Sequence, residues 1–162
     1  MANRLIQEQE NVGPGLKTLS YQYTPDSLVS QTTYPGGTVA SRTYNANRLL
    51  SQTLIGGAVQ ATFGYDTADR RTQRIYINGT QTNWTLDANS RVTDLAHIVP
   101  AIPTTLQEWT YGYTNEGDPL SQADVTPTYT TYGQAYQYDG LHEVTYFKQG
   151  TVVSNDVPTV LS

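Results

Sequence analysis

The stretch TFGYDTADRR, residues 62–71, decides the fold, because versions of it recur along the whole chain. Five positions correspond to its Tyr65, at successive steps of 21, 21, 21, 27 and 25 residues: Tyr23, Tyr44, Leu86, Tyr113 and Tyr138. Two residues earlier the side chain is aromatic in five of the six copies, with Arg42 as the exception. A near-constant period of this length is the signature of a repeat architecture, in which each unit packs on its neighbours.

The composition favours strands and tight turns. Of the 162 residues, 37% are hydrophobic and only 14% charged, and 13 of the 17 aromatic residues are tyrosines. Aromatic and β-branched side chains fit a half-buried pleated surface. The net charge of −5 argues against a nucleic-acid partner, because such binding depends on neutralising phosphates. The lack of cysteine excludes disulfides, thiol chemistry and cysteine metal sites, and no long apolar stretch predicts a membrane span.

Each repeat also contains a turn signal that predicts a hairpin. Gly56-Gly57 is typical of a two-residue hairpin loop, whose central residues need positive φ. Such a loop would pair Ile55 with Ala58, Leu54 with Val59 and Leu50 with Phe63. A predicted apolar face would then hold the following residues: Leu50, Leu54, Val59, Ala61, Phe63 and Tyr65.

We therefore predict an all-β chain of repeated antiparallel hairpins of about 21 residues, forming one continuous curved or spiralling sheet. No window has a helical period, and the helix-compatible stretch around ADRRTQRI lies among strand signals. Two stretches with prolines, residues 95–109 and 123–136, are expected to be enlarged connections that interrupt the ladder. The predicted organisation is a single array over 1–162, with a partial repeat at 1–20 and repeats near 21–41, 42–62, 63–83, 84–110, 111–135 and 136–162.

The pattern Tyr-x-Tyr-Asp-x-x-x-Arg, followed by a hairpin with glycine at its tip, resembles the YD-repeat or Rhs (rearrangement hotspot) family. The third repeat matches best, with Phe63, Tyr65, Asp66 and Arg70. The fourth keeps Asp87 and Arg91 but has Leu86 for tyrosine, and the sixth keeps Tyr138 and Asp139. The first and fifth repeats lack the arginine. The resemblance covers essentially the whole chain.

The resemblance implies a spiralling β-sheet shell around a cavity, as in Rhs toxins, insecticidal toxin complexes and teneurins. It implies a structural, non-enzymatic protein, extracellular or at the cell surface, whose partners are further YD-repeat polypeptide and an enclosed polypeptide. The releasing segment of bacterial members, rich in Asp-Pro, Gly and Asn, is not recognisable in this chain. No cofactor is expected.

The repeated residues themselves are interpreted as structural. A tyrosine ring can pack between neighbouring hairpins while an aspartate accepts hydrogen bonds from turn amides. This interpretation covers the following residues: Tyr23, Tyr44, Tyr65, Asp66, Arg70, Asp87, Arg91, Tyr113, Tyr138 and Asp139. The arginines are expected to pair with repeat carboxylates or to stack on ring faces, with an anion or sugar contact as the weaker alternative.

Three other kinds of site are conceivable: an acid–base cluster, a metal site and a sugar-binding site. His142, Glu143 and the nearby Asp139 are the nearest thing to an acid–base cluster, yet no nucleophile motif accompanies them. His97 lies in a predicted apolar loop, and the histidines and carboxylates have no metal-ligand spacing. Exposed aromatic rings suit sugar binding, and Trp109, Tyr111 and Tyr113 are the best candidates. A carbohydrate-binding adhesin module is therefore the alternative function, which would take a surface glycan as its partner.

The two ends of the sequence fall at a similar phase of the repeat. ANRLIQ at 2–7 nearly copies ANRLLSQ at 46–52, so the chain starts inside a repeat without its Tyr-Asp head. The last residues, TVVSNDVPTVLS, stop near the place where the next head is due. The chain is therefore expected to be a segment of a longer array, or a subunit that associates head-to-tail through Val160-Leu161-Ser162 into a filament.

Overall fold

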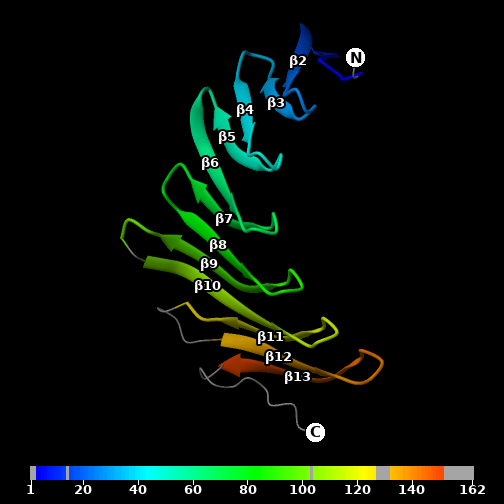
Figure 1. Cartoon of the computed structure of the whole chain (residues 1–162), viewed down its shortest axis with the longest axis vertical. Helices are drawn as coiled ribbons and strands as arrows, with labels where there is room; N and C mark the ends of the chain where they lie inside the picture. Colours follow the sequence, from blue (N-terminus) through cyan, green and yellow to red (C-terminus); the bar gives the residue numbers. More distant parts are fainter. Residues whose placement is uncertain (1–2, 14, 103, 127–131, 152–162) are drawn as a thin grey trace. The chain divides into compact units, whose positions relative to one another are not determined.

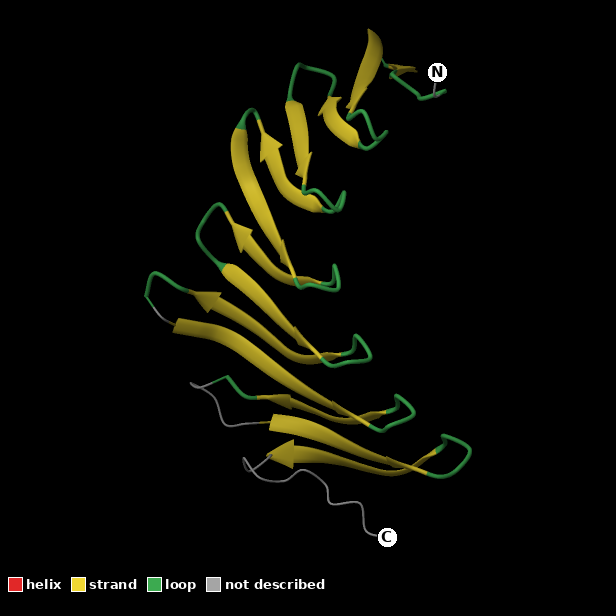
Figure 2. Cartoon of the chain, viewed as in Figure 1, coloured by secondary structure: helices red, strands yellow, loops and turns green. Residues whose placement is uncertain are grey.

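The computed structural model describes residues 3–13, 15–102, 104–126 and 132–151. Within them the chain is all-β, with thirteen strands and no helix (Figure 2). The predicted fold class is thereby confirmed, and the second part of the helix-compatible stretch around ADRRTQRI lies in a strand, Arg71–Tyr76, as its surroundings indicated. Among the described residues there is accordingly no helix long and apolar enough to cross a membrane. The chain divides into two compact units, Met1–Asn78 and Gly79–Ser162. Each is described by itself, and the single array remains a prediction.

The first unit is an antiparallel sheet in which each strand pairs with the next one in sequence (Figure 1). Its strands are β1 (Gln7–Val12), β2 (Gly15–Tyr23), β3 (Val29–Thr33), β4 (Val39–Tyr44), β5 (Leu50–Ile55), β6 (Ala58–Tyr65) and β7 (Arg71–Tyr76).

The second unit repeats the same plan. Its strands are β8 (Gln81–Leu86), β9 (Val92–Val99), β10 (Thr104–Tyr113), β11 (Pro119–Asp124), β12 (Tyr132–Tyr138) and β13 (Val144–Thr151). The predicted chain of consecutive hairpins is therefore present in both units.

A five-residue turn follows each of the six positions that the repeat aligns with Tyr65. We call these the head turns; they comprise residues 24–28, 45–49, 66–70, 87–91, 114–118 and 139–143. In each, the N–H of the first residue donates to the C=O of the fifth, and the N–H of the fourth donates back to the C=O of the first. The fourth residue has positive φ in all six, from 62° at Asp69 to 110° at Gly117. This is a type I turn closed by a left-handed residue, a common three- to five-residue hairpin connection. Within each unit the head turns lie along one side (Figure 2).

The Gly56-Gly57 hairpin confirms the pairs next to the turn and corrects the ones further away. Ile55 pairs with Ala58 and Leu54 with Val59, but Thr53 pairs with Ala61. Gln60 is therefore an extra residue, a β-bulge, and the prediction that Leu50 faces Phe63 is wrong. Since a one-residue slip exchanges the two faces of a strand, the predicted apolar face is divided. Leu54 and Val59 lie on one side, and Ala61, Phe63 and Tyr65 lie on the other. A second register shift, between Thr43 and Tyr44, pairs Leu50 with Tyr44 and places Leu50 on the side opposite Leu54.

The predicted enlarged connections are also corrected. Most of residues 95–109 belongs to strands, because β9 continues to Val99 and β10 begins at Thr104. Pro100 falls in the short connection between them, where no ladder hydrogen bond is required of it. Pro103 lies outside the described residues. In the second stretch, β11 continues to Asp124 and β12 begins at Tyr132. Residues 127–131 lie outside the described residues, as do residues 152–162, which include the predicted head-to-tail contact.

Small residues occupy the buried positions among the described residues. They are Ala40, Ala61 and Ala123, together with Thr32, Thr82, Thr126 and Gly133. Each buried threonine has a hydrogen bond: Thr32 Oγ1 accepts from Arg42, Thr82 Oγ1 contacts His97 Nδ1, and Thr126 Oγ1 accepts from the Glu108 N–H. A single-layer sheet has little interior, so the strand centres are covered mainly by long neighbouring side chains. His97 thus lies on strand β9, not in an apolar loop.

Candidate functional site

The first residue of each head turn holds the turn with its side chain. Asp66 Oδ1 accepts from the N–H groups of Ala68 and Arg70, both at 2.9 Å. Asp87 Oδ1 makes the same two bonds at 2.9 Å, and Asp139 Oδ1 makes them at 2.8 and 3.0 Å. Asn45 accepts in the same way with its amide oxygen. These are Asx turns, which explains why Asp, Asn or Thr recurs after each head.

Hydrogen bonding lowers the pKa of two of these carboxyl groups. The main cause is the backbone N–H of the fifth turn residue, Arg70 for Asp66 and Arg91 for Asp87. The guanidinium groups of the same arginines add to the effect, with Nε to Oδ2 distances of 2.7 and 2.6 Å. Both aspartates are therefore charged at neutral pH, with their oxygens used inside the turn.

The head tyrosines join each repeat to the one before it. Their hydroxyls donate to backbone carbonyls at 2.6–2.9 Å: Tyr23 to Leu5, Tyr44 to Val29, Tyr65 to Leu50, Tyr113 to Val92 and Tyr138 to Pro119. Each acceptor lies directly after a head turn or at the equivalent place in the partial first repeat. The predicted structural residues are thus placed in contacts within the sheet.

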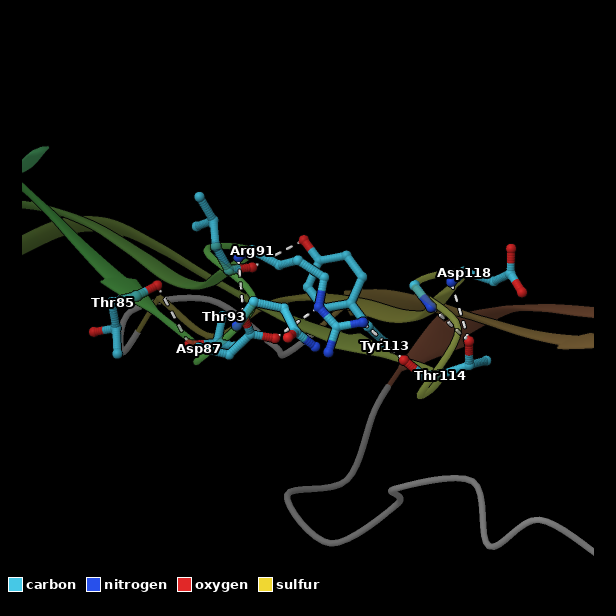
Figure 3. Close-up of polar contacts among 10 residues, drawn as sticks. Thr85, Asp87, Arg91, Thr93, Tyr113, Thr114 and Asp118 are labelled. Atoms are coloured by element: carbon cyan, nitrogen blue, oxygen red, sulfur yellow. Dashed lines mark hydrogen bonds and ion pairs between the residues drawn. The ribbon is translucent and has the colours of Figure 1, made fainter. Parts of the chain in front are cut away.

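Arg91 connects three groups from two repeats, as Figure 3 shows. Its Nε pairs with Asp87 in its own turn, and its Nη1 donates to the C=O of Thr114 in the next head turn at 2.8 Å. Its guanidinium carbon lies 4.8 Å from the centre of the Tyr113 ring. The arginine thereby fixes one head turn against the next through a carboxylate, a carbonyl and a cation–π contact.

Arg4 makes two of these contacts, to a carbonyl and to a tyrosine ring, at the beginning of the chain. Its Nη1 donates to the C=O of Thr24 at 3.2 Å, and its guanidinium carbon lies 5.0 Å from the centre of the Tyr23 ring. Sequence similarity aligned Arg4 with Arg48, but these contacts place it in the position of Arg91, one residue further along the turn. Arg48 itself donates to the C=O of Asp26, in the preceding turn.

The three candidate sugar-binding residues lie on one face of β10, yet they do not form one site. Trp109 packs edge-on against His97, with ring centres 5.9 Å apart. Tyr111 and Tyr113 instead line a hollow together with Tyr136 and Tyr138. We call this the tyrosine hollow; its remaining lining residues are Pro119, Ser121, Gln122 and Val144.

A second hollow, of about 380 Å³, lies at the head turns 114–118 and 139–143. We call it the acidic hollow, and it is lined by Thr114, Glu116, Asp118, Leu120, Tyr136, Gln137, Tyr138, Asp139, Gly140 and His142. The sequence had grouped His142 with Glu143 and Asp139. In the structure, His142 Nδ1 lies 2.6 Å from Asp118 Oδ2, Asp139 Oδ1 accepts from its own turn, and Glu143 does not line the hollow.

The sequence pattern did not identify Asp118 and Glu116 as site residues, because the fifth repeat lacks the arginine of the pattern and was interpreted only as an imperfect copy. Aligning the head turns residue by residue would have placed Asp118 where Arg70 and Arg91 stand. Its hydrogen bond to His142 raises the pKa of the imidazole, and its negative charge raises it further, with smaller contributions from Glu116 and Asp139. The environment of the hollow therefore favours positive charge.

Comparison with solved structures relates this fold to toxin complexes. The crystal structures of TcdB2-TccC3 and TcdB2-TccC3-Cdc42 each match with a TM-score of 0.72 and 16% sequence identity, over 82% of this chain and 7% of the matched chain. A Photorhabdus luminescens Tc holotoxin pore matches with a TM-score of 0.64 and 14% identity, over 84% of this chain and 9% of that one. No protein-family model and no curated protein matches the sequence. The predicted resemblance to toxin-complex proteins is thus confirmed at the level of the fold, and the chain spans less than a tenth of the structures it matches.

Proposed function

We propose that this chain is a structural segment of an Rhs-type β-sheet shell, located outside the cell or at its surface, with no catalytic activity of its own. Its partners would be further repeat segments paired with its edge strands and a polypeptide that the shell encloses. The structural likeness to small portions of toxin-complex chains supports this proposal.

The observation that carries the proposal is the use of the repeated polar groups. The head aspartates bond their own turns, and the five head tyrosines bond the preceding repeat. A motif that recurs because it catalyses or binds would leave its functional atoms directed at a ligand. Here the recurring atoms hold one hairpin to the next, as an extended sheet requires.

Among the described residues β13 pairs only with β12, which leaves its other edge for further pairing, and Lys148 is the one charged residue of the strand. Its exposed side chains include Val144, Tyr146 and Phe147, which are 55%, 49% and 51% exposed. Natural edge strands in free monomers are commonly guarded by charge or proline, because an unguarded apolar edge recruits another strand. If β13 paired with β1 of a second copy, the contact would be head-to-tail. Head-to-tail contacts that do not close into a ring give filaments.

Size-exclusion chromatography with light scattering tests this association. The chain of 17.9 kDa is expected to form larger species as its concentration rises. Tyr146→Lys places a charge on the β13 edge and is expected to shift the protein to monomer. Leu141→Lys is the matched control, because Leu141 is 79% exposed in a head turn and lies off the strand. A wild-type protein that stays monomeric at high concentration, or equal effects of the two variants, would contradict edge pairing.

Carbohydrate binding is the second candidate function, favoured by the four tyrosines around the tyrosine hollow. Aromatic rings pack on the apolar faces of sugars, so a glycan-array screen should find ligands if this function holds. Tyr111→Ala is then expected to abolish binding, whereas Trp109→Ala should preserve it, because Trp109 packs against His97 outside the hollow. An array without hits would rule against this candidate.

A further inference from the structure

Two arginines in the described structure place a guanidinium group over the head tyrosine of the following repeat. Arg4 does so at Tyr23 in the first unit, and Arg91 at Tyr113 in the second. Each also donates through Nη1 to the backbone C=O of the residue after that tyrosine, at 3.2 and 2.8 Å. The tyrosine face and this carbonyl together form a recurring guanidinium seat.

The equivalent position recurs at Tyr138, but the preceding head turn, 114–118, contains no arginine. The Tyr138 hydroxyl donates to the C=O of Pro119 at 2.8 Å, as Tyr113 donates to the C=O of Val92 at 2.9 Å. The ring and the Asp139 carbonyl are therefore the counterparts of Tyr113 and Thr114. The residue that corresponds to Arg91 is Asp118, so an anion stands where the cation would be.

The space at this position is the acidic hollow. The residues that line it include Tyr138, the three acidic residues Glu116, Asp118 and Asp139, and one histidine, His142. The formal charge of the three acidic residues and the histidine is −2 even when the imidazole is protonated. His142 Nδ1 lies 2.6 Å from Asp118 Oδ2, while the His142 side chain remains 56% exposed. A stronger cation could therefore displace the imidazole from Asp118.

We propose that the acidic hollow binds the guanidinium group of an arginine side chain from a second polypeptide. The Asp118 carboxylate and the Asp139 carbonyl accept hydrogen bonds from the guanidinium, and its plane lies on the Tyr138 ring. Arginine fits better than lysine, because a planar, forked donor can stack and make two bonds at once. The inference does not depend on the shell function, because the seat would bind arginine in a free monomer as well.

NMR titration of the isotope-labelled protein with N-acetylarginine amide tests the proposal. We expect saturable shifts of the Tyr138 ring and of the amides of residues 139–142, with a Kd of about 1–10 mM from one cation–π contact and a few charge-assisted hydrogen bonds. The citrulline analogue has nearly the same shape without the charge and should bind at least tenfold more weakly. The lysine analogue should be weaker by severalfold. Equal binding of the arginine and citrulline compounds, or no shift at Tyr138, would overturn the proposal.

Asp118→Arg supplies the missing guanidinium from within the chain and is expected to abolish binding of the arginine compound. Glu10→Arg makes the same change of charge on β1, in the first unit, and should leave the affinity unchanged. If the circular dichroism of Asp118→Arg differs from that of the wild type, Asp118→Asn takes its place and should weaken binding at least fivefold. Undiminished binding by the folded Asp118 variant would show that the hollow is not the site.

Discussion

At the scale of single residues, the head turns show how one position can accept different side chains. Asp66 and Asp87 each bond two backbone amides and one arginine, whereas Asn45 bonds only the two amides. Both side chains have an oxygen in the same place, so the backbone bonds are the shared requirement. The ion pair is an addition found where the fifth residue is arginine.

Replacing Asp87 should separate these two contributions. Asp87→Ala loses both amide bonds and the Arg91 pair, so the melting temperature is expected to fall by roughly a few degrees. Asp87→Asn keeps the amide bonds and should lose less. Because the folded pKa of Asp87 is depressed, its charge stabilises the protein above its ordinary pKa of 3.8, and this stabilisation is lost as the pH falls through the folded pKa. Between pH 7 and pH 2 the melting temperature of Asp87→Asn should therefore fall less than that of the wild type. An equal fall in the two proteins would contradict a stabilising charge at Asp87.

His142 should titrate above its ordinary pKa of 6.5, because Asp118 accepts its hydrogen bond and holds its charge. A raised folded pKa means that the stabilisation is fully present below pH 6.5 and is lost as the pH rises through the folded pKa. NMR titration of the imidazole protons measures this directly. In Asp118→Asn the pKa should fall toward 6.5, whereas an unchanged value in that variant would indicate another cause.

At the scale of the element, each hairpin that is closed by a head turn depends on one residue with positive φ at the fourth position of that turn. Five of the six are not glycine: Ser27, Arg48, Asp69, Ser90 and His142. Left-handed backbone disfavours residues with a Cβ, so these turns are strained in return for a tight reversal. The head turn 114–118 avoids this strain, because its fourth residue is Gly117.

Gly117→Ala should therefore destabilise the protein by about 1 kcal/mol, because φ at this position is +110°. Gly140→Ala is the control, since Gly140 lies in the next head turn without positive φ, and an added Cβ would meet no atom within 4 Å. Its effect is expected to be close to zero. Urea unfolding of both variants measures the difference, and equal free energies of unfolding would refute the role of the turn conformation.

At the scale of the whole molecule, stability comes from neighbours and not from a deep interior. The buried positions among the described residues hold alanine, threonine and one glycine, and most strand residues are half-exposed. In such an array each strand is supported by the strands on its two sides, so the free energy of local opening should be lowest where one neighbour is missing.

Hydrogen exchange monitored by NMR should reveal this gradient within each unit. In the first unit, the amides of β5, which pairs with β4 and β6, are expected to exchange more slowly than those of β1, which pairs with β2. In the second, β10 should be more protected than β13. Uniform protection along a unit would mean that it unfolds as one cooperative block.

The sequence by itself determined the fold class, the repeat and the positions of the turns. These follow from local chemistry, since Asp66, Asp87 and Asp139 cap their own turns and Gly56-Gly57 closes its hairpin within a few residues. The tertiary structure alone decided the bulge at Gln60, the seat of Arg4 and the meeting of His142 with Asp118. A bulge depends on how two strands twist against each other. Asp118 and His142 are 24 residues apart in the sequence, and the pairing of β11 with β12 brings their head turns together. Periodicity reports which side chains recur, but only the register between hairpins brings those of different repeats together.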